Sequence, residues 1–153
     1  MARDPIPTWC IVFAIVHDGK GRFLLIQETD GSWFFPAGPM RRGETWGDAV
    51  QRVCCEEGGV PIVLQGVYKM DHRPVQDGAR MRAFFLAQPL TENAPKRVPD
   101  HHSLGARWFE FTELPDLQLR SLEVLRIIVD LAKGAQIYPL DVLRVEGEVM
   151  AMA

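Results

Sequence analysis

The stretch GPMRRGETWGDAVQRVCCEEGGV, residues 38–60, decides the fold of this chain. Thr45 is followed three residues later by Asp48, and this spacing predicts a capping box at the start of a helix. The Gly-Gly pair near the end of the stretch predicts a helix stop, so we expect a helix over residues 46–57. Its apolar stripe, at a spacing typical of core packing, consists of Trp46, Val50 and Cys54.

Two adjacent carboxylates, Glu56 and Glu57, end this expected helix. Because neighbours three and four positions apart stack on a helix, both flank the direction of Val53. Adjacent carboxylates repel each other, and a hard divalent cation such as Mg²⁺ offsets that repulsion. Arg52 can orient Glu56 through an i, i+4 ion pair, and a backbone carbonyl near Gly38 could approach the same ion. A solvated acidic helix end is the alternative that the residues alone leave open.

Size, charge and cysteine content limit the class of protein. The 153 residues suit one domain with a single core, which we expect to span 1–153. The net charge of −3 argues against a nucleic-acid polymer as partner. Three cysteines, two of them adjacent, do not suggest a disulfide framework and favour a cytoplasmic location. The apolar run at 9–16 is too short to span a bilayer, so we expect no membrane association.

Apolar runs along the chain predict the remaining elements. The first two strands flank an Asp-Gly turn and are expected to form a hairpin. A second helix is expected with Ser121 as its cap and Gly134 as its stop, and its expected buried stripe is Leu122, Leu125, Val129 and Ala132. A short strand through Val142 is an option for the tail. The expected strands are 9–16, 22–27, 33–35, 61–70, 79–88 and 106–111, with a loop at 71–78. Together they predict an α/β or α+β sandwich with a mixed sheet.

The spacing in residues 38–60 resembles the Nudix box, G-x5-E-x7-R-E-U-x-E-E-x-G-U, where U is a bulky aliphatic residue. The stretch WFFPAG resembles the usual lead-in to this box, and ARWFEFTELP resembles a late strand and turn of the family. The resemblance covers roughly the first 133 residues. The matching fixed positions are Gly38, Glu44, Arg52, Glu56, Glu57 and Gly59.

The resemblance implies a Nudix-type α/β/α sandwich that uses Mg²⁺ or Mn²⁺ to hydrolyse a nucleoside diphosphate linked to another group. Carried onto this chain, it makes Glu56 and Glu57 metal ligands, with the carbonyl of Gly38 as a third. It implies that Arg52 orients the glutamates and that Glu44 braces the loop and the helix.

One position departs from the family pattern, which has a glutamate where this chain has Val53. That glutamate is a metal ligand in many members and the general base in some, and a positioned base contributes about 10²–10⁴-fold in rate. Relatives often carry an acid shortly before the late strand, but in the segment DHHSLGARW residues 103–107 contain none. Candidate replacement bases in other loops are Asp100, His101, His102, Asp71 and Asp77.

Three hypotheses therefore remain open. Another loop supplies the base, which is the leading hypothesis, with His102 and Asp100 as first candidates because histidine is a plausible base near neutral pH. Alternatively, two carboxylates and a metal-bound water give slow hydrolysis without a dedicated base. In the third hypothesis the chain is a catalytically impaired nucleotide-binding or regulatory module.

Substrate contacts are expected from arginines and aromatic side chains near the box. Arginine forks can grip phosphates bidentately, and aromatic rings can stack a nucleobase. The segment PAGPMRRGE is similar to the box entrance of Nudix enzymes that act on oxidised guanine nucleotides, but the sequence does not fix the substrate or decide between monomer and homodimer. The candidate substrate-binding residues are Arg41, Arg42, Arg80, Arg82, Trp33 and Phe35.

Overall fold

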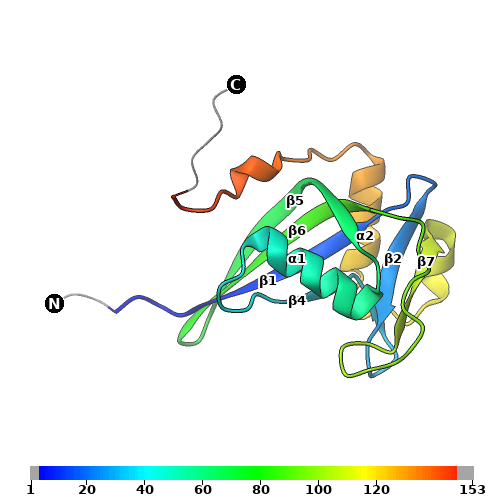
Figure 1. The fold of residues 1–153 in the computed structure, drawn as a ribbon, viewed down its shortest axis with the longest axis horizontal. Helices are drawn as coiled ribbons and strands as arrows, with labels where there is room; N and C mark the ends of the chain where they lie inside the picture. The colour runs from blue at the N-terminus through cyan, green and yellow to red at the C-terminus, as the bar shows by residue number, and fades with distance from the viewer. Residues whose placement is uncertain (1–3, 148–153) are drawn as a thin grey trace.

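Seven strands form two sheets in the computed structural model, which describes residues 4–147. The strands are β1 (Thr8–Val16), β2 (Arg22–Gln27), β3 (Trp33–Phe34), β4 (Ala37–Pro39), β5 (Ile62–Val75), β6 (Gly78–Pro89) and β7 (Gly105–Glu110). The larger sheet has the order β4-β1-β6-β5 and the smaller has the order β3-β2-β7 (Figure 1). Because β1 is parallel to β6 and antiparallel to β4, the larger sheet is mixed, as the sequence predicts.

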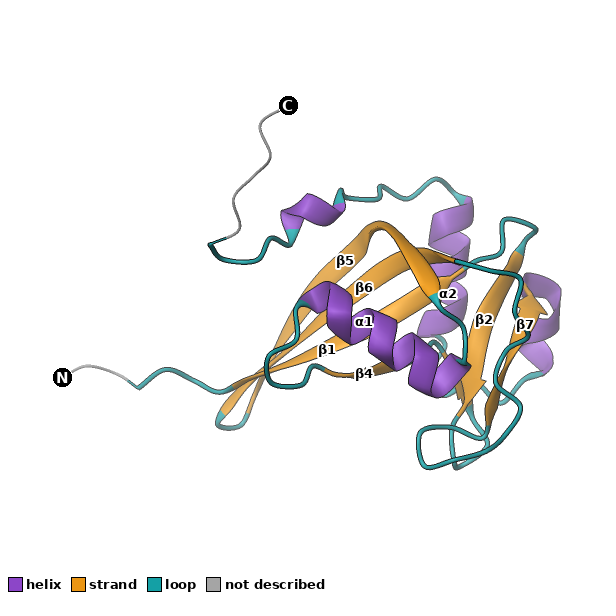
Figure 2. Cartoon of the chain, viewed as in Figure 1, coloured by secondary structure: helices purple, strands orange, loops and turns teal. Residues whose placement is uncertain are grey.

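Two helices cover opposite faces of the larger sheet, and this arrangement confirms the expected α/β/α sandwich (Figure 2). They are α1 (Trp46–Val53) and α2 (Glu123–Ala132). The core is correspondingly divided in two. One part packs under α1 and includes Val50, Val53 and Cys54. The other packs under α2 and includes Phe13, Phe84 and Ile127.

The N-terminus of α1 has the capping box that the sequence predicts. The Asp48 backbone N–H donates to the Thr45 hydroxyl at 3.1 Å, and the Thr45 backbone N–H donates to the Asp48 carboxylate at 3.1 Å. Beyond Val53 the chain continues into a π-helical segment, η1 (Cys54–Gly58), and ends at Gly59 with φ of 68°. The predicted helix is therefore one continuous helical segment whose last turn is wider than an α-helical turn.

The expected hairpin of the first two strands is wrong. β1 and β2 lie in different sheets, and the turn between them makes only a single antiparallel bridge, from His17 to Phe23. The loop expected at 71–78 is also mostly strand, because β5 extends to Val75 and β6 begins at Gly78. Asp71 is consequently a strand residue opposite Arg82.

The late helix forms, but its expected buried stripe is wrong. Leu122 is 62% exposed, and the buried residues of α2 are Val124, Ile127 and Ile128. The tail strand is absent from the described residues: Tyr138 makes one bridge to Val67, and a short 3-10 helix, η3 (Leu140–Val142), follows. None of the helices in residues 4–147 has the length and apolar character that crossing a bilayer would require.

Candidate active site

Glu56 and Glu57 lie at the C-terminal end of the α1–η1 helix, and Arg52 links Glu56 to Glu44 in the loop before α1. Glu44 and Arg52 form a two-pronged ion pair, with Nε to Oε2 at 2.6 Å and Nη2 to Oε1 at 2.9 Å. Glu44 also accepts the backbone N–H of Arg41 at 2.6 Å, while Arg52 donates to the carbonyl of Pro39 at 2.9 Å. This pair joins the loop after β4 to the helix, and it holds the pKa of Glu44 down at about 2, chiefly through the Arg52 hydrogen bonds.

Glu56 lies between two guanidinium groups. Its Oε2 is 3.3 Å from Nη1 of Arg52, and its Oε1 is 3.3 Å from Nη1 of Arg41. His102 approaches the same carboxylate, with Nδ1 3.5 Å from Oε2. Arg52 thus contacts both Glu44 and Glu56, and the i, i+4 pairing expected from the sequence is present.

Glu57 points toward the strand that carries Gly38. Its Oε1 accepts a hydrogen bond of 2.8 Å from the backbone N–H of Ala37. Burial raises the pKa of Glu57 to about 8, helped by the charges of Glu28 and Glu56 and opposed by the Ala37 N–H and Lys96. A carboxylate in such surroundings is more stable when a cation replaces its proton, so the site fits a hard divalent ion.

Val53 belongs to the core and not to the site. Its side chain is 2% exposed, and a Cβ added to Gly38 would lie only 3.0 Å from its Cγ2. The helix is therefore apolar at this position because the side chain packs against the backbone of Gly38. Here the chain uses the position for packing, where the family pattern has an acid.

The late loop between β6 and β7 is attached to the same helix end. Lys96 Nζ donates to the carbonyl of Glu56 at 3.0 Å and to Asp100 Oδ1 at 2.5 Å. Asp100 Oδ1 also accepts the backbone N–H of His102 at 2.8 Å. The Lys96 ammonium and these amides lower the pKa of Asp100 to about 2, so Asp100 braces the loop and is a poor proton acceptor near neutral pH.

Glu28 is a residue of this neighbourhood that the sequence did not single out. It follows the end of β2, and its charge contributes to the raised pKa of Glu57. Its carboxylate is held by Arg120 Nη1 at 2.7 Å and by the Ser32 hydroxyl at 3.2 Å. The available signal was its position at a strand end, where polar side chains often line sites.

The expected substrate-binding residues are divided among different parts of the molecule. Arg41 reaches Glu56, and Arg42 is exposed in the same loop. Trp33 is half-buried and lines a cavity of about 440 Å³ together with Lys96 and Arg97. The prediction that Phe35 binds substrate is wrong, because its ring is 1% exposed and is part of the core under α2.

The two arginines of β6 lie away from the helix end. Arg82 forms ion pairs with Asp71 at 2.6 Å and with Glu123 at 2.9 Å, on the face of the sheet that α2 covers. Its guanidinium also lies 4.9 Å from the centre of the Phe84 ring. Arg80 stands opposite Trp9 in the β1–β6 ladder. The structure therefore does not bring either arginine into contact with Glu56 or Glu57.

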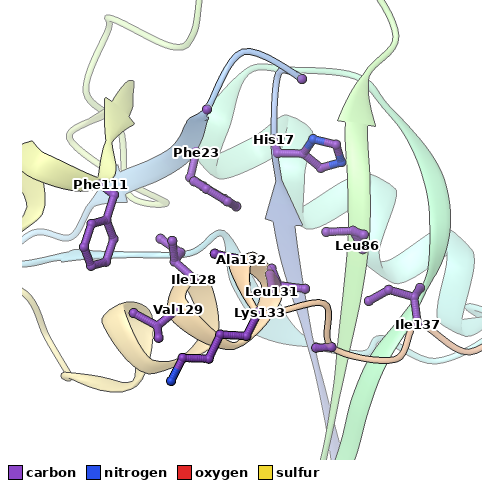
Figure 3. A pocket seen from close by; sticks show the side chains of 13 residues that line it. His17, Phe23, Leu86, Phe111, Ile128, Val129, Leu131, Ala132, Lys133 and Ile137 are labelled. Atoms are coloured by element: carbon purple, nitrogen blue, oxygen red, sulfur yellow. The ribbon is translucent and has the colours of Figure 1, made fainter.

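A separate cavity lies on the α2 side of the molecule. It encloses about 730 Å³ between α2 and the β1–β2 turn (Figure 3). Its walls are mainly apolar, with Phe23, Leu86 and Ile128 among them, and its ionisable residues are His17 and Lys133. It contains no carboxylate, so it does not provide the chemistry that a metal and a diphosphate need.

No preassembled cluster of three His, Cys, Asp or Glu side chains with metal-binding geometry occurs within residues 4–147. The candidate site supplies two carboxylates, and a backbone carbonyl must complete it. That donor set suits Mg²⁺, which keeps several waters and is bound by one or two carboxylates together with substrate phosphates.

Comparison with known proteins gives the same assignment as the box. The model of the NUDIX domain family matches residues 9–127. The chain belongs to the NUDIX family. Among similar NUDIX structures, a NUDIX hydrolase from Nitrosomonas europaea superposes with a TM-score of 0.75 at 25% identity, over 95% of this chain and 100% of that one. An ADP-ribose pyrophosphatase from Streptococcus suis superposes with a TM-score of 0.65 at 20% identity, over 86% and 96%, and shares the fold.

Two NUDIX relatives are similar in sequence. The human 8-oxo-dGDP phosphatase NUDT18 is 34% identical over 124 residues, which are 77% of this chain and 37% of that protein. The phosphatase NudJ of Escherichia coli is 30% identical over 147 residues, which are 94% of this chain and 92% of that protein. The chain thus spans little more than a third of the length of the first relative and nearly the whole of the second.

Proposed function

We propose that this NUDIX domain, which we take to span 1–153, hydrolyses a diphosphate bond in a nucleoside diphosphate linked to another moiety, with Mg²⁺ or Mn²⁺ as cofactor. The observation that carries the proposal is the placement of Glu56 and Glu57 at one helix end beside the strand of Gly38. Its NUDIX relatives, named as phosphatases and hydrolases, support an enzyme of this class.

Glu56, Glu57 and the carbonyl of Gly38 would hold the metal. The ion supplies charge neutralisation on the phosphoryl oxygens and activation of water. Arg52 fixes Glu56 and is itself fixed by Glu44, so the three side chains form one rigid unit. Such surrounding hydrogen bonds orient metal ligands and raise their affinity for the ion.

His102 is the proposed general base, because it is the late-loop side chain that contacts a site carboxylate. It takes a proton from the attacking water as the new phosphorus–oxygen bond forms and the bond to the bridging oxygen breaks. Asp100 serves this base indirectly, since it accepts the His102 backbone N–H and so sets the loop conformation.

Arg41 and Arg42 are the proposed phosphate contacts. Arg41 already reaches Glu56 and can shift to a phosphate at the same place. We further propose that the nucleoside part lies toward Trp33, because the cavity lined by Trp33 also contains Lys96, whose ammonium contacts the helix end. All three cysteines are free, in keeping with the proposed cytoplasmic location. The proposed partner is a small nucleotide diphosphate substrate, on which the protein acts as a monomer or homodimer.

A hydrolysis screen tests this proposal. Nucleoside diphosphate derivatives, including oxidised guanine nucleoside diphosphates and ADP-ribose, are incubated with the protein and Mg²⁺ or Mn²⁺, and products are separated by chromatography. We expect turnover of at least one substrate that is lost in Glu56→Gln and in Glu57→Gln. Turnover that survives both substitutions would place the chemistry elsewhere.

A catalytically impaired nucleotide-binding module is the second candidate, and the buried Val53 favours it. Val53→Glu distinguishes the two functions. Nucleotide binding without turnover in the wild type, with turnover gained in Val53→Glu, supports the module. A wild type that hydrolyses rapidly and is no faster as Val53→Glu excludes it.

A further inference from the structure

Three consecutive carbonyls at the end of η1 are each bonded to the late loop. The Glu56 carbonyl accepts from Lys96 Nζ at 3.0 Å, and the Gly58 carbonyl accepts from the Lys96 backbone N–H at 2.8 Å. Between them, the Glu57 carbonyl accepts from the hydroxyl of Ser103 at 2.6 Å. The last carbonyls of a helix lack partners within the helix, and here the loop between β6 and β7 supplies all three donors.

Lys96 makes most of this attachment. Its side chain is 10% exposed, which is unusual for a lysine. The ammonium lies at a helix C-terminus, where positive charge is favourable. The Lys96 carbonyl also accepts the backbone N–H of Ala106 at 2.9 Å. Lys96 therefore connects the helix end to the start of strand β7.

The glycine after η1 leaves room for this contact. Gly59 has φ of 68°, and a Cβ on it would lie 3.0 Å from both the backbone nitrogen and the Cβ of Lys96. Gly134, which follows α2, has a similar φ of 85°, but no neighbouring atom lies within 4 Å of the place that a Cβ would take there. Gly59 is therefore restricted by its neighbour as well as by its conformation.

The other end of the loop carries His102. Asp100 connects the two ends, because its Oδ1 accepts from Lys96 Nζ at 2.5 Å and from the His102 backbone N–H at 2.8 Å. Ser103, whose hydroxyl donates to the Glu57 carbonyl, is fully buried. Movement of the Lys96 ammonium would therefore change the position of His102 as well as the end of the helix.

We infer that Lys96 is a positioning residue, which fixes the Glu56–Glu57 helix end and His102 relative to each other by attaching the 96–103 loop to the last turn of the helix. The inference rests on the proposed function of that site. It matters in this chain because Val53 supplies no acid, and the proposed base, His102, lies in the loop that Lys96 attaches. Lys96 needs no contact with substrate for this role.

Substitution of Lys96 tests the inference. Lys96→Met keeps the length of the side chain and removes the ammonium, Lys96→Arg keeps a cationic donor, and Lys133→Met is the control because Lys133 is exposed on the far end of α2. The first readout is the Mn²⁺ dissociation constant, measured by electron paramagnetic resonance without nucleotide. The second is amide hydrogen exchange at His102 and Ser103 in the metal-free protein.

Lys96→Met is expected to weaken Mn²⁺ binding about 10–100-fold, the usual effect of removing a group that orients metal ligands. Exchange at His102 and Ser103 is expected to accelerate at least about tenfold, which corresponds to a loss of local protection. Lys96→Arg should lie between Lys96→Met and wild type, and Lys133→Met should match wild type. Wild-type Mn²⁺ affinity and wild-type exchange in Lys96→Met would overturn the inference.

A glycine pair provides an independent test if Lys96→Met does not fold. Gly59→Ala and Gly134→Ala carry the same conformational penalty, but only Gly59→Ala displaces Lys96. We expect weaker Mn²⁺ binding in Gly59→Ala alone. Equal, unchanged binding in both variants would overturn the inference.

Kinetics separates this inference from the proposed function. If wild type hydrolyses a substrate, Lys96→Met should lower kcat at saturating Mn²⁺ about 10–100-fold with little change in KM. A rise in KM of about 10–100-fold with unchanged kcat would contradict the positioning role of Lys96. If wild type hydrolyses nothing, the proposed function fails, and the Mn²⁺ and exchange measurements still decide the role of Lys96.

Discussion

The Glu57 carboxylate accepts a 2.8 Å hydrogen bond from the backbone N–H of Ala37, twenty positions earlier in the chain. This bond points Glu57 at β4, one residue from Gly38. The proposed metal ligands therefore lie on one strand, β4, and one helix end, η1, which this bond joins. A site built in this way is held more precisely than one built on loops alone.

The pKa of Glu57 predicts how the stability of the metal-free protein depends on pH. Burial first, and then Glu28 and Glu56, raise this pKa from 4.5 to about 8. Between these values the folded chain retains a proton that the unfolded chain has lost, so this group's contribution to stability is full below 4.5 and is lost as the pH rises through about 8. In Glu57→Gln this loss should be absent.

Urea unfolding in the presence of a chelator, from about pH 5 to about pH 9, measures this difference. The free energy of unfolding of wild type relative to Glu57→Gln should fall steadily with pH and level off above about 8. Parallel curves for the two proteins would show that Glu57 ionises normally in the fold.

Removing the charge of Glu44 should disturb the site without touching the metal ligands. Glu44 holds Arg52 through two hydrogen bonds, and Arg52 in turn holds Glu56. We expect Glu44→Gln to lower kcat/KM about 10–100-fold, as for other groups that orient ligands. Glu92→Gln, an exposed change in the late loop, is the control, and similar losses in both would argue against a specific role for Glu44.

Neighbouring histidines give a matched test of the proposed base. His102 is half-buried with Nδ1 3.5 Å from Glu56, whereas His101 is exposed. His102→Asn should lower kcat about 10²–10⁴-fold, and His101→Asn should change it little. If His101→Asn has the larger effect, the assignment of the base is wrong.

The capping box of α1 should contribute to overall stability. Thr45→Ala removes the hydroxyl that accepts the Asp48 backbone N–H. We expect a loss of about 1 kcal/mol in the free energy of unfolding, within the usual range for such caps. Thermal unfolding beside Thr91→Ala, an exposed loop change, provides the comparison, and equal midpoints would contradict a role for the cap.

Local signals in the sequence predicted the positions of helices and strands better than they predicted how these elements pair and pack. The capping box and the strands near 9–16 and 22–27 are where the pattern places them. The hairpin was wrong because an apolar run indicates a strand but not the sheet it joins. The stripe of α2 was wrong because its sequence is apolar on several faces, so periodicity does not select Ile127 over Leu122.

Contacts between distant segments could not be predicted. The box spacing identified Glu56 and Glu57, but Lys96 and Ser103 lie in an aperiodic loop about forty residues later, and nothing local indicates where such a loop packs. Glu28 was missed for the same reason, because it reaches the site through the packing of β2 against η1. Phe35 was misassigned because exposure of an aromatic side chain depends on both sheets together.

Metal binding by the helix end is the central claim, and a Mn²⁺ titration followed by electron paramagnetic resonance tests it most directly. Wild type, Glu56→Gln and Glu57→Gln are titrated with and without a nonhydrolysable nucleoside diphosphate analogue. The account predicts that wild type binds Mn²⁺ and that each substitution weakens binding at least about tenfold. Equal binding by all three proteins, or none by wild type with the analogue present, would contradict it.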